Sequence, residues 1–230
     1  MKRFYKKAAA EPAEDGFAIT LDGRPVKTPK RVSLILPTSA LALSVAAEWD
    51  AQGEDIDPRS MPLTGLANAA IDHVETDRNT FAATLAGYAE TDLLCYRAEG
   101  PATLAALQAE RWDPILVWAR ERYAIDFVVT TGIIHRAQPS KTVARLTAAI
   151  GERSDFQLAG FQPLVTISGS LVIALALAEG YIDARAAFDA AHVDEMWQAE
   201  QWGEDVWATA MRDDHRRDFE AAARFLALVV

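Results

Sequence analysis

The stretch GFAITLDGRPVKTPKRVSLIL, residues 16–36, decides the fold class of this chain. GFAITL and RPVKT favour strands, because β-branched and aromatic side chains fit a pleated, half-buried surface. Between them, Asp22-Gly23 suits a tight hairpin, since glycine adopts a positive φ at no steric cost. VSLIL supplies a third strand before Pro37. The stretch predicts a small antiparallel sheet, which needs another element packed on it.

The rest of the chain favours helices. Thr38 or Ser39 can cap the first helix, in which Leu41, Val45 and Trp49 recur at four-residue steps. Pro114 lies inside a later helical pattern, so that helix starts or bends there. The segment 126–137 is β-branched and predicts a short strand. Alanine-rich patterns with helical periodicity cover the remainder, over 61–74, 78–96, 103–123, 139–152, 183–192 and 194–230.

The predicted fold class is therefore α+β. Composition shifts from β-rich to α-rich near residues 37–60, and no internal repeat or low-complexity linker is present. We expect a small, antiparallel β-rich N-terminal domain at residues 1–60, followed by a larger, mostly α-helical domain at residues 61–230. A chain of 230 residues is long enough to bury a substantial core.

The charge is negative overall and unevenly distributed. A net charge of −10 argues against broad nucleic-acid binding through phosphates. Residues 1–31 hold eight Lys and Arg against four Asp and Glu, so this segment carries +4 and the remainder −14. The basic segment is either a solvated surface or a surface that orients a partner of opposite charge.

Two features bear on compartment and membrane. Cys95 is the only cysteine, which excludes an intramolecular disulfide; its apolar surroundings predict a buried, inert thiol. Residues 157–178 carry no charge and are long enough to span a bilayer. Polar residues and Pro163 dilute the first half, however, so we predict a buried helix pair or a kinked helix and no membrane insertion.

The stretch DEMWQAEQWGEDVW, residues 194–207, places three of the six tryptophans among five carboxylates. A continuous helix over 194–211 would turn one apolar stripe to the core: Met196, Ala199, Gly203, Val206 and Ala210. Its two flanks would hold Trp197, Glu200, Glu204, Trp207 and Met211 on one side, and Trp202 with Glu195 on the other. These tryptophans then either dock a protein partner or pack against neighbouring helices. The other three, Trp49, Trp112 and Trp118, are assigned to the core.

Motifs for catalysis or cofactors are absent from the sequence. It has no glycine-rich loop with the lysine of a phosphate-binding motif, and no G-x-S-x-G. The four histidines are scattered, so we predict no metal and no cofactor. One enzymatic alternative remains, an acidic-site hydrolase using carboxylates of the 194–207 helix. It predicts a pocket that holds two or more of Glu195, Glu200 and Glu204.

Motifs along nearly the whole chain resemble the ATP12 family, the assembly chaperones of the F1 sector of ATP synthase. No single motif is diagnostic, but their order and coverage are specific. They are RFYK (3–6), LDGRPVKTP (21–29), AAEWDAQ (46–52), MPLTGLANAAID (61–72), TDLLCYR (91–97), the Q-x3-W-D-P of Gln108, Trp112, Asp113 and Pro114, GSLVIALAL (169–177), and the E-x-W-Q-x3-W-G of Glu195, Trp197, Gln198, Trp202 and Gly203.

The resemblance implies a chaperone and no enzyme. Such a protein binds the unassembled α subunit of F1-ATPase and prevents its aggregation until the β subunit joins. The family fold, a β-rich N-terminal domain joined to a helical one, agrees with the pattern above. An acidic residue of the E-x-W-Q motif matters for function in the family, which points to Glu195. The candidate partner-binding residues are Glu195, Asp194, Trp197, Gln198, Glu200, Trp202 and Glu204.

The resemblance also sets expectations for state and location. We expect a monomer when free, with no nucleic-acid partner. The chain starts two residues before RFYK, without an Arg- and Ser-rich targeting extension. This predicts a bacterial cytoplasmic protein, or a protein of the mitochondrial matrix if the sequence is a processed eukaryotic form.

Overall fold

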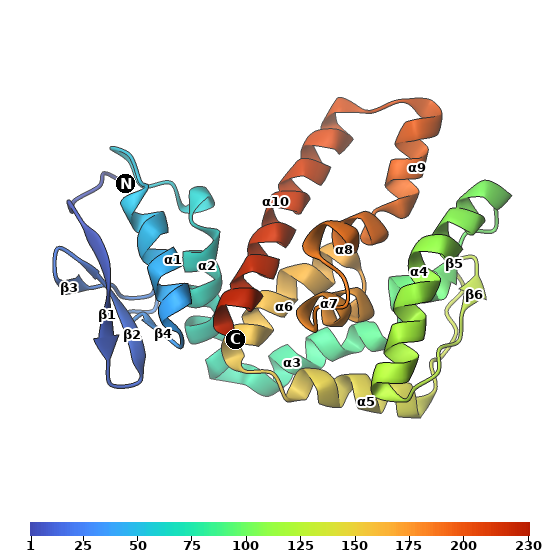
Figure 1. The fold of residues 1–230 in the computed structure, drawn as a ribbon, viewed down its shortest axis with the longest axis horizontal. Coiled ribbons are helices and arrows are strands. Elements are labelled where there is room, and N and C mark those ends of the chain that lie inside the picture. Colours follow the sequence, from blue (N-terminus) through green and yellow to red (C-terminus); the bar gives the residue numbers. More distant parts are fainter. The chain divides into compact units, whose positions relative to one another are not determined.

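The computed structural model describes residues 1–230, which form two compact units. Unit 1 comprises Met1–Arg78, Ser154–Gly160 and Arg224–Val230, and unit 2 comprises Asn79–Arg153 and Phe161–Ala223. The division falls inside helices α6 (Asp155–Ser168) and α10 (Val206–Val229), which contribute residues to both units; Figure 1 labels both helices. The division into two units does not tell whether residues 1–60 and residues 61–230 fold independently. The predicted domain boundary at residue 60 therefore stays a prediction.

Unit 1 contains the predicted antiparallel sheet. Strand β2 (Gly16–Leu21) pairs with β1 (Ala8–Ala13), β3 (Arg24–Pro25) and β4 (Ile35–Leu36). Asp22 and Gly23 have φ of 49° and 77°, the positive values that a tight hairpin needs. Gly16 is required at the preceding turn, because its φ is 145° and a Cβ there would overlap the carbonyl oxygen of Leu36. The sequence pattern does not indicate β1, and the strands at RPVKT and VSLIL are shorter than expected.

Helix α1 (Ser39–Asp50) covers one face of this sheet (Figure 1). Thr38 caps it, accepting a hydrogen bond from Leu41 N. The Glu48 carboxylate in turn accepts hydrogen bonds from the first backbone amides of α2 (Pro62–Ala69). The chain continues as η1 (Pro58–Ser60) before α2, and as η2 (Ala70–Val74) and η3 (Glu75–Asp77) after it. Completely or almost completely buried side chains form the core of unit 1: Ile19, Leu34, Leu36, Leu41, Val45, Leu63 and Phe225.

Unit 2 is mainly helical, which confirms the predicted fold class. It contains a short parallel pair of strands, β5 (Tyr96–Arg97) and β6 (Thr130–Thr131), and most of the helices. They are α3 (Arg78–Ala86), η4 (Gly87–Ala89), η5 (Leu93–Cys95), α4 (Ala102–Tyr123), α5 (Ser140–Gly151), part of α6, α7 (Leu171–Ala178), α8 (Ala184–Ala191), α9 (Val193–Trp202) and most of α10.

Helix α7 is the centre of unit 2, and residues 171–176 are fully buried. Its N-terminus is satisfied by two side chains. Ser170 accepts a hydrogen bond from Ile173 N, and the buried Asp92 carboxylate accepts from Val172 N at 2.9 Å and from the Ser170 hydroxyl at 2.7 Å. The uncharged stretch 157–178 is thus the predicted helix pair, α6 and α7. No helix in this structure combines the length and apolarity that crossing a membrane requires.

Several local predictions are confirmed and others are wrong. Cys95 is buried, and burial raises the pKa of its thiol to about 12, which makes it inert. The helix containing Pro114 does not start there, because α4 begins at Ala102 and runs through it. Residues 90–96 are not a continuation of a helix, and within 126–137 only Thr130–Thr131 form a strand. Trp112 is in the core at 1% exposure, whereas Trp49 and Trp118 are half-buried at its edge.

The continuous helix predicted over 194–211 is also wrong. Helix α9 ends at Trp202, Gly203 has a φ of 88°, and α10 begins at Val206. A left-handed residue ends a helix because its backbone cannot continue the hydrogen-bond ladder. The apolar stripe expected to face the core is broken in consequence: Val206 is 80% exposed and Ala210 is also exposed.

Candidate functional site

The candidate site is the helical hairpin of α9 and the first turns of α10, both in unit 2. Its turn is built by two residues. Gly203 ends α9, and Asp205 caps α10, since its Oδ1 accepts hydrogen bonds from Trp207 N at 3.0 Å and Ala208 N at 2.9 Å. The cap fixes the first turn of α10, so Trp207 lies at the tip of the hairpin together with Trp202, the last residue of α9.

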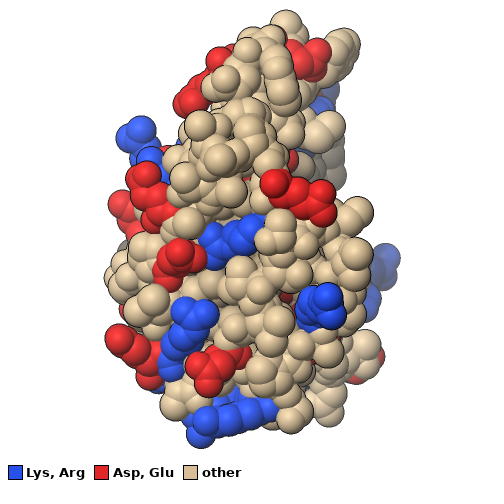
Figure 2. Space-filling model, turned by 90° about the vertical axis from the view of Figure 1, so that its right-hand side faces the viewer, with Lys and Arg blue, Asp and Glu red and all other residues tan.

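Large apolar side chains are exposed around this tip. Trp202 is 75% exposed and Trp207 is 83% exposed, and Val206 and Met211 are exposed beside them. Figure 2 shows one face of the molecule, at whose upper end uncharged side chains predominate and carboxylates lie at the edges. Scattered apolar residues are normal on a protein surface, but several large ones on one short turn indicate an interaction surface.

The predicted tryptophans of this region therefore fall into two groups. Trp202 and Trp207 are exposed, as the docking interpretation requires. Trp197 is half-buried, and its ring meets that of Trp202 edge to face at a centroid distance of 5.7 Å. Such a contact holds the Trp202 indole in a defined orientation while most of its surface stays in water. A fixed, exposed indole loses little conformational entropy when a partner covers it.

The carboxylates differ in their surroundings. Glu195, Glu200 and Glu204 are exposed. Glu204 lies 3.3 Å from Arg212, and Glu195 lies 3.7 Å from Nε2 of His192. Asp194 is different, because it is half-buried and its Oδ1 accepts a hydrogen bond of 2.7 Å from Nε2 of Gln108 in α4.

The buried His192 lies beneath Glu195. Its Nδ1 is 2.9 Å from the Phe188 carbonyl oxygen, and its ring stacks on the Phe188 ring at 3.9 Å. A carbonyl can only accept, so Nδ1 carries the proton in the neutral ring. Burial lowers the pKa of His192 below its usual value, and the neutral ring then presents Nε2 towards Glu195.

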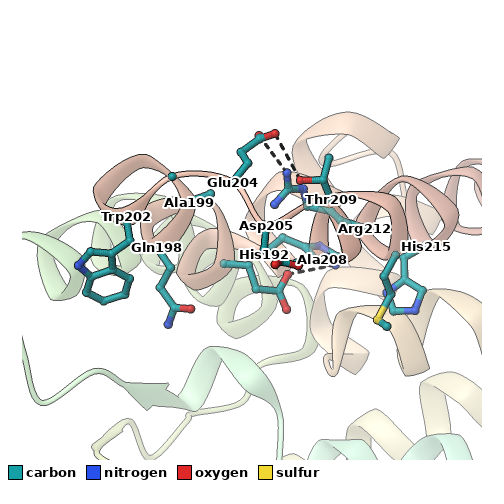
Figure 3. Close-up of a pocket in the computed structure, with 13 residues that line it drawn as sticks. His192, Gln198, Ala199, Trp202, Glu204, Asp205, Ala208, Thr209, Arg212 and His215 are labelled. Carbon is teal, nitrogen blue, oxygen red and sulfur yellow. Dashed lines mark hydrogen bonds and ion pairs between the residues drawn. The ribbon is translucent and has the colours of Figure 1, made fainter.

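A shallow pocket of about 330 Å³ lies between α9 and the start of α10 (Figure 3). Glu195 and Glu204 both line it, and Glu200 lines an adjoining hollow of about 250 Å³. The hydrolase alternative required such a gathering of carboxylates. The side chains of Glu195 and Glu204 are 62% and 63% exposed, however, and they lack the desolvated surroundings that a general acid needs.

The structure brings most of the predicted site residues to one hairpin. Gln198, Trp202, Glu195 and Glu204 line the pocket, whereas Trp197 and Asp194 make contacts within the protein. The list of candidate partner-binding residues omits several exposed or pocket-lining residues after Glu204, although the sequence places Trp207 and Met211 on a flank of the helix: Asp205, Val206, Trp207, Met211 and Arg212. A signal for them is present, because glycine followed by an N-cap aspartate is typical of a helix break.

Comparison with known proteins gives consistent matches. The family model described as ATP12 chaperone protein matches residues 2–120. A mitochondrial protein of Schizosaccharomyces pombe named atp12 is 25% identical over 238 residues, covering 98% of this chain and 80% of its own length. This protein and the two proteins of solved structure described next are named either as Atp12 or as a chaperone, and none of the three is named as an enzyme.

Solved structures match over the entire chain. The crystal structure of Atp12 from Paracoccus denitrificans is 40% identical, with a TM-score of 0.96 and coverage of 100% of this chain and 98% of that one. A putative chaperone from Agrobacterium tumefaciens, the Atu1473 protein, is 38% identical with a TM-score of 0.96, over 100% of this chain and 86% of that one. Family model, sequence and fold agree over the parts of the chain that each covers, and the chain belongs to the ATP12 family of chaperone proteins.

Proposed function

We propose that this protein is an assembly chaperone that binds the unassembled α subunit of F1-ATPase and prevents its aggregation until the β subunit joins. Membership of the ATP12 family supports the chaperone role. The observation that carries the contact site is the exposure of Trp202 and Trp207 on a turn bordered by Glu195, Glu200 and Glu204.

The physical task of such a chaperone is to cover apolar surface for a limited time. A free subunit exposes surface that assembly later buries, and large apolar patches aggregate. A partner that binds the folded subunit stabilises it by mass action. The partner must also be released, so its interface should combine a few aromatic anchors with polar groups and should not resemble a dry, obligate interface.

The hairpin tip fits this requirement. The two exposed indoles supply large contact areas at low entropic cost, and carboxylates beside them pair with cations. We therefore expect the bound surface of the α subunit to be apolar with a basic rim. Asp194 has a supporting role in this proposal: its hydrogen bond with Gln108 fixes the start of α9, which carries Glu195.

We further expect the free chaperone to be a monomer. The exposed charges favour this state, because a net charge of −10 opposes self-association. We also expect the chain to act in the bacterial cytoplasm, or in the mitochondrial matrix if it is a processed eukaryotic form, and the origin of its relatives in bacteria and in fission-yeast mitochondria supports this.

The test uses purified F1 α subunit, light scattering and size-exclusion chromatography. Wild-type protein should suppress aggregation of α and elute with it as a stoichiometric complex. Glu195→Lys should weaken the complex about tenfold or more, which corresponds to roughly 1.4 kcal/mol of lost binding free energy. Its melting temperature should stay close to that of the wild type, because the side chain is exposed.

A matched charge reversal elsewhere tests whether the effect of Glu195→Lys depends on the position of the charge or only on the net charge of the protein. Glu220 is an exposed carboxylate on α10 outside the hairpin tip, and Glu220→Lys should bind α like the wild type. Equal binding by both variants would remove Glu195 from the contact site. A wild-type protein that neither binds α nor keeps it in solution would contradict the proposed function itself.

A further inference from the structure

The N-terminal segment of unit 1 is tied tightly to helix α1. The Arg3 guanidinium donates hydrogen bonds to four carbonyl oxygens: Tyr5 at 3.2 Å, Lys6 at 2.9 Å, Asp50 at 3.1 Å and Gln52 at 2.6 Å. Two backbone hydrogen bonds add to this, from Arg3 N to Glu54 O and from Ile56 N to Met1 O. The first residues of a chain are commonly loose unless tied down, and here they are tied down.

This attachment presents Phe4 to solvent. Tyr5 points inward, is buried, and donates from its hydroxyl to the Trp49 carbonyl oxygen at 2.6 Å. Phe4 is its neighbour in the chain, and its side chain is 68% exposed. The two rings meet edge to face at 5.4 Å, which holds the Phe4 ring in place.

Phe4 borders a pocket of about 730 Å³ that lies wholly within unit 1. Apolar and aromatic side chains from the N-terminal segment, the β2–β3 hairpin and α1 line most of it: Met1, Phe4, Tyr5, Leu21, Pro25, Val26 and Trp49. The size and lining suit a large apolar side chain with some of the backbone that carries it.

The charged groups at this pocket are mainly cationic. Arg24 and Lys27 line it and are exposed, and neither has an ion-pair partner in unit 1. Asp22 is the one acidic residue of the lining, but its carboxylate already accepts hydrogen bonds from the backbone amides of Lys6 and Lys7. With two cations against one carboxylate, the charged side chains of the lining carry a net positive charge on a body that is otherwise acidic.

We propose that this pocket docks an acidic peptide segment of another protein, with one large apolar side chain of that segment seated against Phe4 and Trp49. The cationic rim selects carboxylates on either side of the anchor by charge complementarity. The fixed Phe4 ring reduces the entropy lost on binding. A small polar ligand fits less well, because the floor offers few convergent polar groups.

This site differs from the hairpin tip in unit 2 in both charge and location. The tip is acidic and suits a basic surface, whereas the Phe4 pocket is cationic and suits an acidic one. The proposal does not depend on the identity of the partner at the tip. It predicts a binding activity that persists when Glu195 is changed.

The experiment selects ligands from a displayed library of random twelve-residue peptides on the full-length protein. Peptides bound by both wild type and Glu195→Lys should share a large apolar residue flanked by Asp or Glu. A synthetic, labelled copy of the strongest one is then titrated by fluorescence anisotropy. Phe4→Ala and Lys27→Glu should each weaken its binding about tenfold or more, with unchanged thermal melting.

Two matched variants serve as controls. Leu43→Ala removes another exposed apolar side chain of unit 1, and Arg59→Glu reverses another exposed cation of the unit; neither residue lines the pocket. Both should bind the peptide within about twofold of wild type. Failure to enrich acidic-apolar sequences, or equal binding by Phe4→Ala, overturns the proposal. Concentration-dependent dimerisation that Phe4→Ala abolishes would also overturn it, by assigning the pocket to a second copy of the chain.

Discussion

Single residues of one type serve different purposes here, and the tryptophans show it best. Trp112 is buried, and its indole N–H donates to the Ala190 carbonyl oxygen at 2.7 Å. Trp207 is almost fully exposed, and no part of its ring is needed to fill the core. Burial decides whether an indole contributes to folding or is available for binding.

A pair of truncations tests this distinction. Trp112→Ala should destabilise the protein by about 3–5 kcal/mol, because it leaves a cavity and an unsatisfied carbonyl. Trp207→Ala should change stability by less than about 0.5 kcal/mol and should weaken binding of the F1 α subunit. Urea unfolding followed by circular dichroism measures the first effect and chromatography of the complex the second. A large loss of stability in Trp207→Ala would show that the tip is structural.

A second prediction at this scale concerns Asp92. Burial raises the pKa of its carboxyl from 3.8 to about 6, despite the hydrogen bonds that it accepts at the start of α7. With a raised folded-state pKa, its contribution to stability is fully present below the unfolded value and is lost as pH rises through about 6. The full change is on the order of 3 kcal/mol.

Asp92→Asn should remove this pH dependence, whatever its cost to absolute stability. The measurement is the free energy of unfolding in urea at several pH values between about 3 and 7, with the variant subtracted from the wild type. His192 has the opposite sign, since its lowered pKa gives stability that is present above 6.5 and lost as pH falls. The contribution of His192 is the same in the wild type and in Asp92→Asn, so it cancels in the difference between their free energies of unfolding. A difference independent of pH would mean that Asp92 stays ionised.

At the scale of elements, local signals in the sequence are more dependable than long-range ones. Asp22-Gly23 alone specifies the β2–β3 hairpin, so its position is predictable. Strand β1 escapes prediction because AAAEPA lacks β-branched and aromatic residues and contains Pro12; it forms by pairing along the whole of β2. The hydrogen bond between Gln108 and Asp194 joins residues 86 apart, and no local pattern indicates it.

In the α9–α10 hairpin, two sequence signals conflict, because one predicts a continuous helix and the other predicts a helix break. Apolar periodicity across residues 194–211 predicts a single helix, although Gly203 and Asp205 are typical of a helix end and a new start. Most of the candidate residues do lie on one surface, as the sequence indicates. Their grouping around a turn is not predictable in this way, because periodicity assumes that the helix continues.

A glycine substitution in the turn, compared with a glycine substitution inside a helix, tests the conformation of the turn. Gly203 has a φ of 88° and a ψ of 162°, and no atom lies within 4 Å of the place that an alanine methyl group would take, so Gly203→Ala should cost about 1–3 kcal/mol from backbone strain alone. Gly65 lies inside α2 with equally open space and a helical backbone, so Gly65→Ala should stabilise the protein by about 0.5–1 kcal/mol. Thermal unfolding of both variants compares them. Stabilisation by Gly203→Ala would indicate that α9 and α10 join into one helix.

On the scale of the whole molecule, the structure has two surfaces of opposite charge. The uneven distribution of charge along the sequence only suggests them. The basic excess within residues 1–31 includes the rim of the Phe4 pocket, and the acidic remainder includes the hairpin tip. Both surfaces combine exposed aromatic rings with charges of a single predominant sign. Aromatic contact area is insensitive to salt, whereas exposed charges are screened over about 10 Å at 0.1 M ionic strength.

Salt therefore separates the two contributions to binding of the F1 α subunit. Raising NaCl from about 50 mM to about 500 mM should slow association of the wild-type protein several-fold and change the dissociation rate much less, because exposed charges mainly steer the encounter. Glu195→Lys should bind weakly at both concentrations with a smaller salt dependence, and Trp207→Ala should keep the salt dependence while dissociating faster. Stopped-flow fluorescence provides both rates. Association that is equally fast at both salt concentrations would exclude the acidic rim as a steering element and leave the exposed tryptophans as the main determinants of the contact.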